Sequence, residues 1–200
     1  MFFGDPYRFA IFVECIPDWN PPATSFHNGL FYYSINGNFF PQDLRTATLC
    51  VDVNTLLDPA HALGARPENA EIYAMPATEA FRHLYTITNP ESTAEEEYPE
   101  GDAAFRAETE NIAECGVSVF AVANGPMVRV LAAKTQRLVP KKNSDRYEWI
   151  EVRKPVVSEV ILPVEELTAI LAGIKNYYSS LSLSAVKRPA TDFPSQKDHS

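Results

Sequence analysis

Proline is the residue that most limits how this chain can fold, because it interrupts the sequence at 16 positions. A proline has no backbone N–H to donate, so it is excluded from the interiors of helices and strands. Regular elements are therefore expected in the windows between prolines. Those windows are 7–16, 23–40, 42–58, 100–125, 127–139, 141–154 and 164–188.

The N-terminal part of the chain predicts a hairpin. Residues 8–16 are rich in β-branched and aromatic side chains, a composition typical of a strand. Residues 29–35 predict a second strand, and the Asn36-Gly37 pair that follows favours a type I′ turn into a third strand at 38–40. This segment should therefore form antiparallel strands joined by a tight turn.

Two apolar runs later in the chain predict a second hairpin. They cover residues 116–123 and 127–135 and flank an Asn124-Gly125 pair, another sequence suited to a tight turn. Both runs are apolar enough to lie in the middle of a sheet. Antiparallel pairing is therefore expected to dominate the fold.

Other segments give less regular patterns. Residues 48–53 predict a strand, with Asp52 near its end, and residues 147–162 predict one or two strands divided at Pro155. The stretch 58–75 is harder to assign and is expected to be loop with a turn of helix.

Helical periodicity points to two helices. The first covers 76–86 and places four apolar side chains on one face: Ala77, Ala80, Phe81 and Leu84. The second begins after Pro163, with Glu165 and Glu166 in its first turn, where carboxylates complement the helix dipole. Residues 103–114 give a weaker helical pattern.

Together these elements predict an α+β fold, in which an antiparallel sheet built from hairpins has two or three helices packed on one face. The length suits one domain, which we expect at 1–181. Residues 182–200 are polar and are expected to form a disordered C-terminal tail.

The net charge of −9 is concentrated in one place. Residues 91–114 hold nine acidic residues and one base, a net charge of −8, so the rest of the chain is almost neutral. An acidic chain is a poor match for nucleic acid or for an anionic membrane, both of which attract basic surfaces. The acidic segment is interpreted in two ways: as a solvated loop that keeps the protein soluble, or as a docking surface for a basic partner.

No cofactor or metal site is predicted. The eight glycines are too dispersed for a phosphate-binding loop, and the four histidines and three cysteines lack the spacing of metal-ligand motifs. The sequence also lacks a recognisable signal peptide or membrane-spanning run, so a cytoplasmic location is expected.

One catalytic alternative remains open at this point. Asp5, His27 and Asp52 could meet as an acid–base set of a small hydrolase, and Cys50 could act as a nucleophile near His83. For each of these residues a structural role is the simpler interpretation. The same holds for the aromatic residues at 31–33 and 39–40, which suit core packing better than base stacking because no Lys or Arg is interleaved with them.

Several segments together resemble the bacterial polymorphic-toxin immunity protein 42 family. They are FGDPYRFAI (3–11), PDWN (17–20), FHNGLF (26–31), INGNFFP (35–41), TATL (46–49), VFAV (119–122), VLAAK (130–134) and ILP (161–163). The resemblance implies a cytoplasmic protein that binds and neutralises a cognate toxin domain and has no catalytic residues of its own.

Under this hypothesis the acidic segment becomes a candidate binding site. If the toxin is basic, five carboxylates would steer it: Glu95, Glu96, Glu97, Glu100 and Asp102. Trp19, in a proline-rich loop, is a candidate anchor or a tryptophan at the edge of the core. A hydrolase and an adaptor with many partners remain the alternatives, and the oligomeric state is open.

Overall fold

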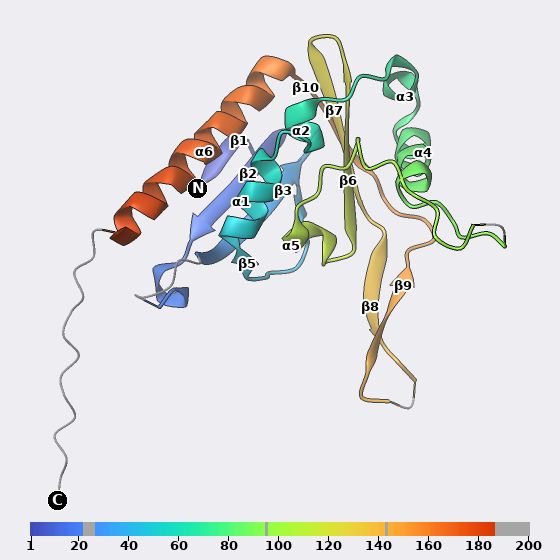
Figure 1. Ribbon diagram of the computed structural model, residues 1–200, viewed down its shortest axis with the longest axis horizontal. Coiled ribbons are helices and arrows are strands. Elements are labelled where there is room, and N and C mark those ends of the chain that lie inside the picture. The colour runs from blue at the N-terminus through green and yellow to red at the C-terminus, as the bar shows by residue number, and fades with distance from the viewer. Residues whose placement is uncertain (22–26, 95, 143, 187–200) are drawn as a thin grey trace, which may run out of the picture.

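A computed structural model describes residues 1–21, 27–94, 96–142 and 144–186. In this part of the chain the strands form three antiparallel sheets, and the helices pack around the first two of them (Figure 1). The α+β fold built from antiparallel hairpins is therefore confirmed. The strands divide among three sheets instead of forming the single sheet that was expected.

The first sheet has the strand order β1-β2-β3-β4, and a short strand, β5, pairs with the opposite end of β3. Its strands are β1 (Phe2–Asp5), β2 (Phe9–Cys15), β3 (Asn28–Ile35), β4 (Asn38–Phe40) and β5 (Ala47–Thr48). Asn36 and Gly37 have φ angles of 52° and 77°, as a type I′ turn requires. The predicted N-terminal hairpin is thus confirmed, whereas β1 was not expected.

The second sheet has the order β10-β7-β6 and contains the predicted hairpin at Asn124-Gly125. Its strands are β6 (Val117–Asn124), β7 (Met127–Lys134) and β10 (Ser158–Pro163). The third sheet has two strands, β8 (Gln136–Pro140) and β9 (Tyr147–Glu151), and it extends away from the rest of the molecule (Figure 1). Strands β9 and β10 confirm that 147–162 holds two strands, one on each side of Pro155.

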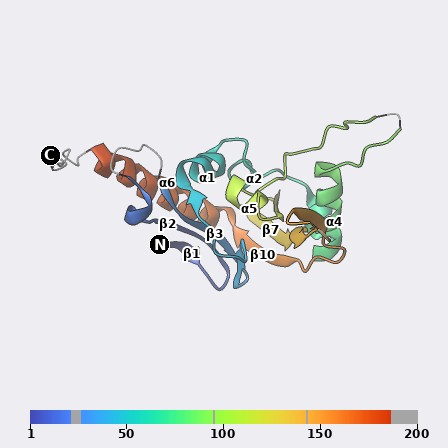
Figure 2. The same ribbon diagram turned by 90° about the horizontal axis from the view of Figure 1, so that it is seen from below.

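The helices cover the first two sheets. They are η1 (Pro17–Trp19, a 3-10 turn), α1 (Leu49–Leu57), α2 (Ala62–Ala65), α3 (Ala70–Ala74), α4 (Ala77–Thr88), α5 (Glu110–Ala113) and α6 (Val164–Val186). Helices α4 and α6 were predicted. Helices α1 and α6 contact each other and lie on the same side of the first sheet (Figure 2).

The prediction of a strand at 48–53 was wrong, because α1 occupies this segment. Leu49, Val53 and Leu56 lie four and three residues apart and are all buried, so they form one apolar helical face. The β-branched residues favour a strand locally, but burial of this face against β3 and α6 outweighs that preference. Asp52 consequently lies within a helix.

Among the described residues, the larger of two core clusters joins the two main sheets. One face of β2 and β3, the apolar faces of α1 and α6, and one face of β6 and β7 meet in it. The second cluster lies on the opposite face of β6 and β7, where Phe120 and Leu131 pack against Phe81 and Leu84 of α4. The second sheet is therefore covered on both faces, which accounts for the apolar runs in its sequence.

The final helix continues to Val186, so the first five residues of the predicted tail are helical. The rest of that predicted tail, 187–200, lies outside the described residues. In the described part of the chain, no helix combines the length and apolar character needed to span a membrane.

Candidate functional site

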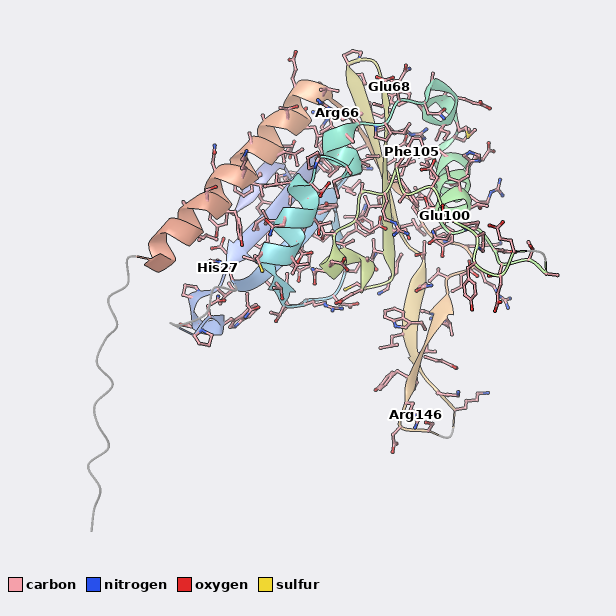
Figure 3. All side chains as sticks on the ribbon, viewed as in Figure 1. His27, Arg66, Glu68, Glu100, Phe105 and Arg146 are labelled. Carbon is pink, nitrogen blue, oxygen red and sulfur yellow. The ribbon has the colours of Figure 1, made fainter. Side chains whose placement is uncertain are left out.

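The acidic segment divides into two parts with different structures. Residues 91–102 hold six acidic residues and no base, and they form a loop that leaves the end of α4 (Figure 3). Glu96, Glu97, Glu100 and Asp102 are exposed in this loop, whereas Glu95 lies outside the described residues. We refer to 91–102 as the acidic loop.

Hydrogen bonds fix the base and the tip of the acidic loop. At its base, Thr88 Oγ1 donates to the carbonyl of Asp102 at 3.0 Å, and the Asp102 amide donates to the carbonyl of Ile87 at 2.9 Å. Near its tip, Ser92 Oγ donates to the carbonyl of Glu97 at 2.6 Å. The loop therefore presents its carboxylates from a defined position beside α4.

The second part of the acidic segment, 103–114, is largely tied into the fold. Glu108 pairs with Arg106 at 3.0 Å and accepts a hydrogen bond from the amide of Val119 on β6. Glu114 forms a salt bridge with Arg45. These two carboxylates are engaged within the chain, whereas Glu110, the third of this part, is exposed at the start of α5. Most of the freely available charge is therefore that of the acidic loop.

Trp19 ends the 3-10 turn η1 and is 40% exposed. Its backbone is fixed, because its amide donates to the carbonyl of Ile16 and its carbonyl accepts from Asn28 Nδ2 at 3.2 Å. Both views place η1 and the acidic loop at opposite ends of the molecule (Figures 1 and 2). The two predicted parts of the binding site are therefore not brought together.

The structure separates Asp5 from His27, two residues of the hydrolase alternative. Asp5 pairs with Phe9 at the start of β2, whereas His27 lies beside Asn28, next to the row that contains Cys15 at the end of β2. At about 3.3 Å per residue, the six steps from Phe9 to Cys15 separate the two ends of this strand by roughly 20 Å. Asp5 and His27 are therefore too far apart to share a proton.

Asp52 has a structural role. It is 1% exposed, and its Oδ1 accepts a hydrogen bond at 3.0 Å from the amide of Asn111 at the start of α5. The Asn111 side chain donates in turn to the carbonyl of Phe31 on β3. Burial raises the pKa of Asp52, and this hydrogen bond opposes that rise. Asp52 and Asn111 together fasten α5 to α1 and to the first sheet.

Two apolar surfaces were not anticipated. On the outer face of the first sheet, Phe2, Phe12 and Tyr32 form one row across three strands, in which Phe2 is exposed, Phe12 is half-buried and Tyr32 is buried. The ring centroids of Phe2 and Phe12 lie 4.8 Å apart. On the β8–β9 hairpin, Trp149 and Tyr147 are exposed. Sequence patterns indicate which segments are strands but do not show which strand faces stay uncovered, so neither surface could be inferred.

Comparison with known proteins places the chain in a family. The family described as immunity protein 42 matches residues 1–177, which is most of the chain. The chain belongs to this family. The resemblance seen in the sequence is therefore confirmed, and the protein is an immunity protein that neutralises a toxin.

A solved structure shares the fold of this immunity protein 42 family member. The crystal structure of CdiI from Burkholderia dolosa AUO158 aligns with a TM-score of 0.65 and 22% sequence identity, covering 88% of this chain and 99% of that one. At that identity the similarity concerns the fold. None of the curated proteins matches the sequence significantly.

Proposed function

We propose that this immunity protein neutralises a cognate toxin domain by binding it directly, in the cytoplasm, without catalysing a reaction. The observation that carries the proposal is the family match over residues 1–177. The separation of Asp5 from His27 supports the non-catalytic role, because the hydrolase alternative needs both residues at one site.

Co-expression with the toxin domain encoded beside this gene tests the proposal. Cells that produce both proteins should survive and yield a complex that stays together during purification. A toxin domain from an unrelated gene pair serves as the control and should still kill. Direct neutralisation is excluded if the adjacent toxin also kills, or if no complex survives purification.

The acidic loop is the part of the surface that we propose attracts the toxin. The loop contains six carboxylates and no Lys or Arg. Its described carboxylates are exposed, and the base of the loop is held beside α4. A concentrated charge of this kind accelerates encounter with a partner of opposite charge and restricts the orientation of approach. The proposed toxin therefore has a basic surface.

Amide substitutions separate this effect from a solubility role. A variant with E96Q, E97Q, E100Q and D102N should associate with the toxin about tenfold more slowly at low ionic strength, because it loses electrostatic steering. The difference should shrink in 1 M salt, where screening acts within about 3 Å.

The matched control carries D18N, E71Q, E79Q and E165Q, four exposed carboxylates outside the loop. It has the same net charge as the loop variant, so its association rate reports the effect of total charge alone. Equal rates for the two variants would mean that the acidic loop has no specific part in association.

A further inference from the structure

The β8–β9 hairpin has no hydrophobic core of its own. Among the described residues of 136–151, none is buried, and only Val139 and Ile150 are half-buried. The hairpin extends from the body of the molecule, with Arg146 at its tip (Figure 3). An isolated two-stranded hairpin is marginally stable in water, so its apolar side chains gain most when another surface covers them.

One face of the hairpin carries an apolar stripe. Leu138 is paired with Trp149, and Pro140 is paired with Tyr147, so all four side chains lie on the same face. Leu138, Trp149 and Tyr147 are 50%, 49% and 64% exposed. Tryptophan and tyrosine are the residue types that contribute most binding energy at protein interfaces.

This face leads into a groove beside α4. Glu151, on the same face as Trp149, also lines a groove of about 430 Å³ between α4 and the segment 151–157. Phe81, Tyr85 and Val157 contribute apolar lining. The hairpin face and the groove therefore form one continuous surface that is concave at the hairpin base.

The charge of this surface is opposite to that of the acidic loop. The segment 136–154 contains six bases and three acids, and Arg82 adds another cation at the groove. Within the described residues none of these seven cations forms a salt bridge. Arg137, paired with Ile150, lies on the other face of the hairpin, and the remaining six lie at the hairpin tip or beside the groove: Arg82, Lys141, Lys142, Arg146, Arg153 and Lys154. A partner that covers the surface must bring apolar side chains together with acidic ones.

We propose that the Trp149 face of the hairpin and the adjoining groove bind an acidic, apolar surface of the toxin domain and anchor the complex. This inference rests on the proposed function. Both views place the acidic loop and the hairpin at the same end of the molecule, away from α6 (Figures 1 and 2). Two neighbouring surfaces of opposite charge admit a partner in one orientation, so the loop governs encounter and the hairpin governs the lifetime of the complex.

The two tryptophans of the chain provide a matched test of the anchor. Affinity for the toxin domain encoded beside this gene is measured by surface plasmon resonance for the wild type, W149A, L138A and W19A. Trp19 and Trp149 are similarly exposed, at 40% and 49%, and the elements that carry them, η1 and β9, lie at opposite ends of the molecule (Figure 1). W149A should weaken binding about 30-fold, mainly through faster dissociation. W19A tests the other candidate anchor, and its loss of affinity should be much smaller than that of W149A.

A charge-reversal variant provides a second readout. R153E combined with K154E leaves the apolar stripe intact and should also weaken binding, with the largest loss at low salt. Unchanged thermal unfolding of each variant shows that the fold is retained, as expected for positions without buried contacts.

The outcomes distinguish this inference from the proposed function. If the wild type binds the toxin and W149A, L138A and the charge reversal bind equally well, the anchor lies elsewhere and only the inference fails. A loss of affinity seen only in W19A would place the anchor at the other end of the molecule and would also overturn the inference. If W149A instead converts a dimer of the protein alone into a monomer, the surface joins two copies of this chain. Failure of the wild type to bind removes the proposed function and the inference together.

Discussion

Arg129 is a buried cation that joins α3 to the second sheet. It lies on β7, is 3% exposed, and pairs through Nε with Glu159 of β10 at 2.6 Å. Its Nη1 donates to the carbonyls of Tyr73 and Met75 at 2.8 and 2.7 Å, at the end of α3. One side chain thus satisfies backbone acceptors that the helix itself leaves free.

Replacing Arg129 should destabilise the protein strongly. R129M fills a similar volume but leaves Glu159 unpaired and the α3 carbonyls without a donor, which should lower the free energy of unfolding by about 2–4 kcal/mol. Urea denaturation measures the loss. R137A, at an exposed position on β8, is the control and should stay within about 0.5 kcal/mol of the wild type.

His61 should make stability depend on pH. It caps α2 by accepting a hydrogen bond from the Leu63 amide, and burial lowers its pKa from 6.5 to about 4. Between pH 6.5 and about pH 4, His61 is therefore protonated in the unfolded chain but neutral in the folded protein. The free energy of unfolding consequently falls as the pH falls from 6.5 towards 4. The loss attributable to His61 should approach about 3 kcal/mol, at 1.36 kcal/mol per pKa unit.

Unfolding of H61N across this pH range isolates the contribution of His61. Asparagine can keep the helix cap but cannot be protonated, so H61N should lose less stability than the wild type between pH 7 and pH 4. H83N alters an exposed histidine on α4 and should retain the wild-type profile. A wild-type profile in H61N would show that other groups cause the acid sensitivity.

At the scale of elements, Gly116 controls how the hairpin leaves the second sheet. Its φ is +70°, and a Cβ there would lie 2.4 Å from the carbonyl oxygen of Gln136 at the start of β8. The Gly116 carbonyl also accepts from the amides of Thr135 and Gln136. The backbone can approach this closely only where there is no side chain.

G116A should therefore destabilise the protein more than a change of backbone preference alone would. We expect it to lower the free energy of unfolding by more than about 2 kcal/mol, against about 1 kcal/mol for G125A. Gly125 also has a positive φ, +57°, but a Cβ there would meet nothing within 4 Å. Thermal unfolding of the two variants gives the comparison, and equal losses would mean that the contact with Gln136 is not limiting.

The elements that could be predicted were those with strong local signals. The Asn-Gly turns located both hairpins, and the spacing of apolar residues located α4 and α6. The prediction of a strand at residues 48–53 was wrong because β-branched side chains favour a strand locally, whereas packing against β3 and α6 stabilises a helix. Strand β8 was missed because it is mostly exposed and carries no alternating apolar pattern.

The candidate site was predictable only in its charge. The acidic residues are adjacent in sequence, so composition alone located them. Trp149 and Tyr147 were correctly placed in a strand, but their exposure depends on where that strand lies relative to the rest of the fold. Asp52 and Asn111 come together through contacts 59 residues apart, which no local pattern reports.

At the scale of the whole molecule, binding of the toxin should raise the melting temperature. A ligand that binds only the folded state at about 100 times its Kd adds about 2.7 kcal/mol of stability. For a chain of this size that corresponds to a rise in Tm of roughly 5–10 °C. Differential scanning fluorimetry with increasing amounts of the toxin domain measures the shift, and a constant Tm would contradict binding to the folded protein.

The contacts between the first strands and the last helix have a consequence for synthesis on the ribosome. Arg8 Nη1 donates a hydrogen bond to Glu166 Oε2, 158 residues further along the chain. Tyr177 Oη accepts a hydrogen bond from the amide of Cys15, 162 residues earlier. Leu167, Ile170 and Ile174 of α6 complete the core over the first sheet. At about 5–20 residues per second, roughly 8–30 s pass between translation of the first strand and of the helix that covers it. During that interval the part of the first sheet that α6 covers stays exposed on the nascent chain, so the core can close only after α6 has emerged.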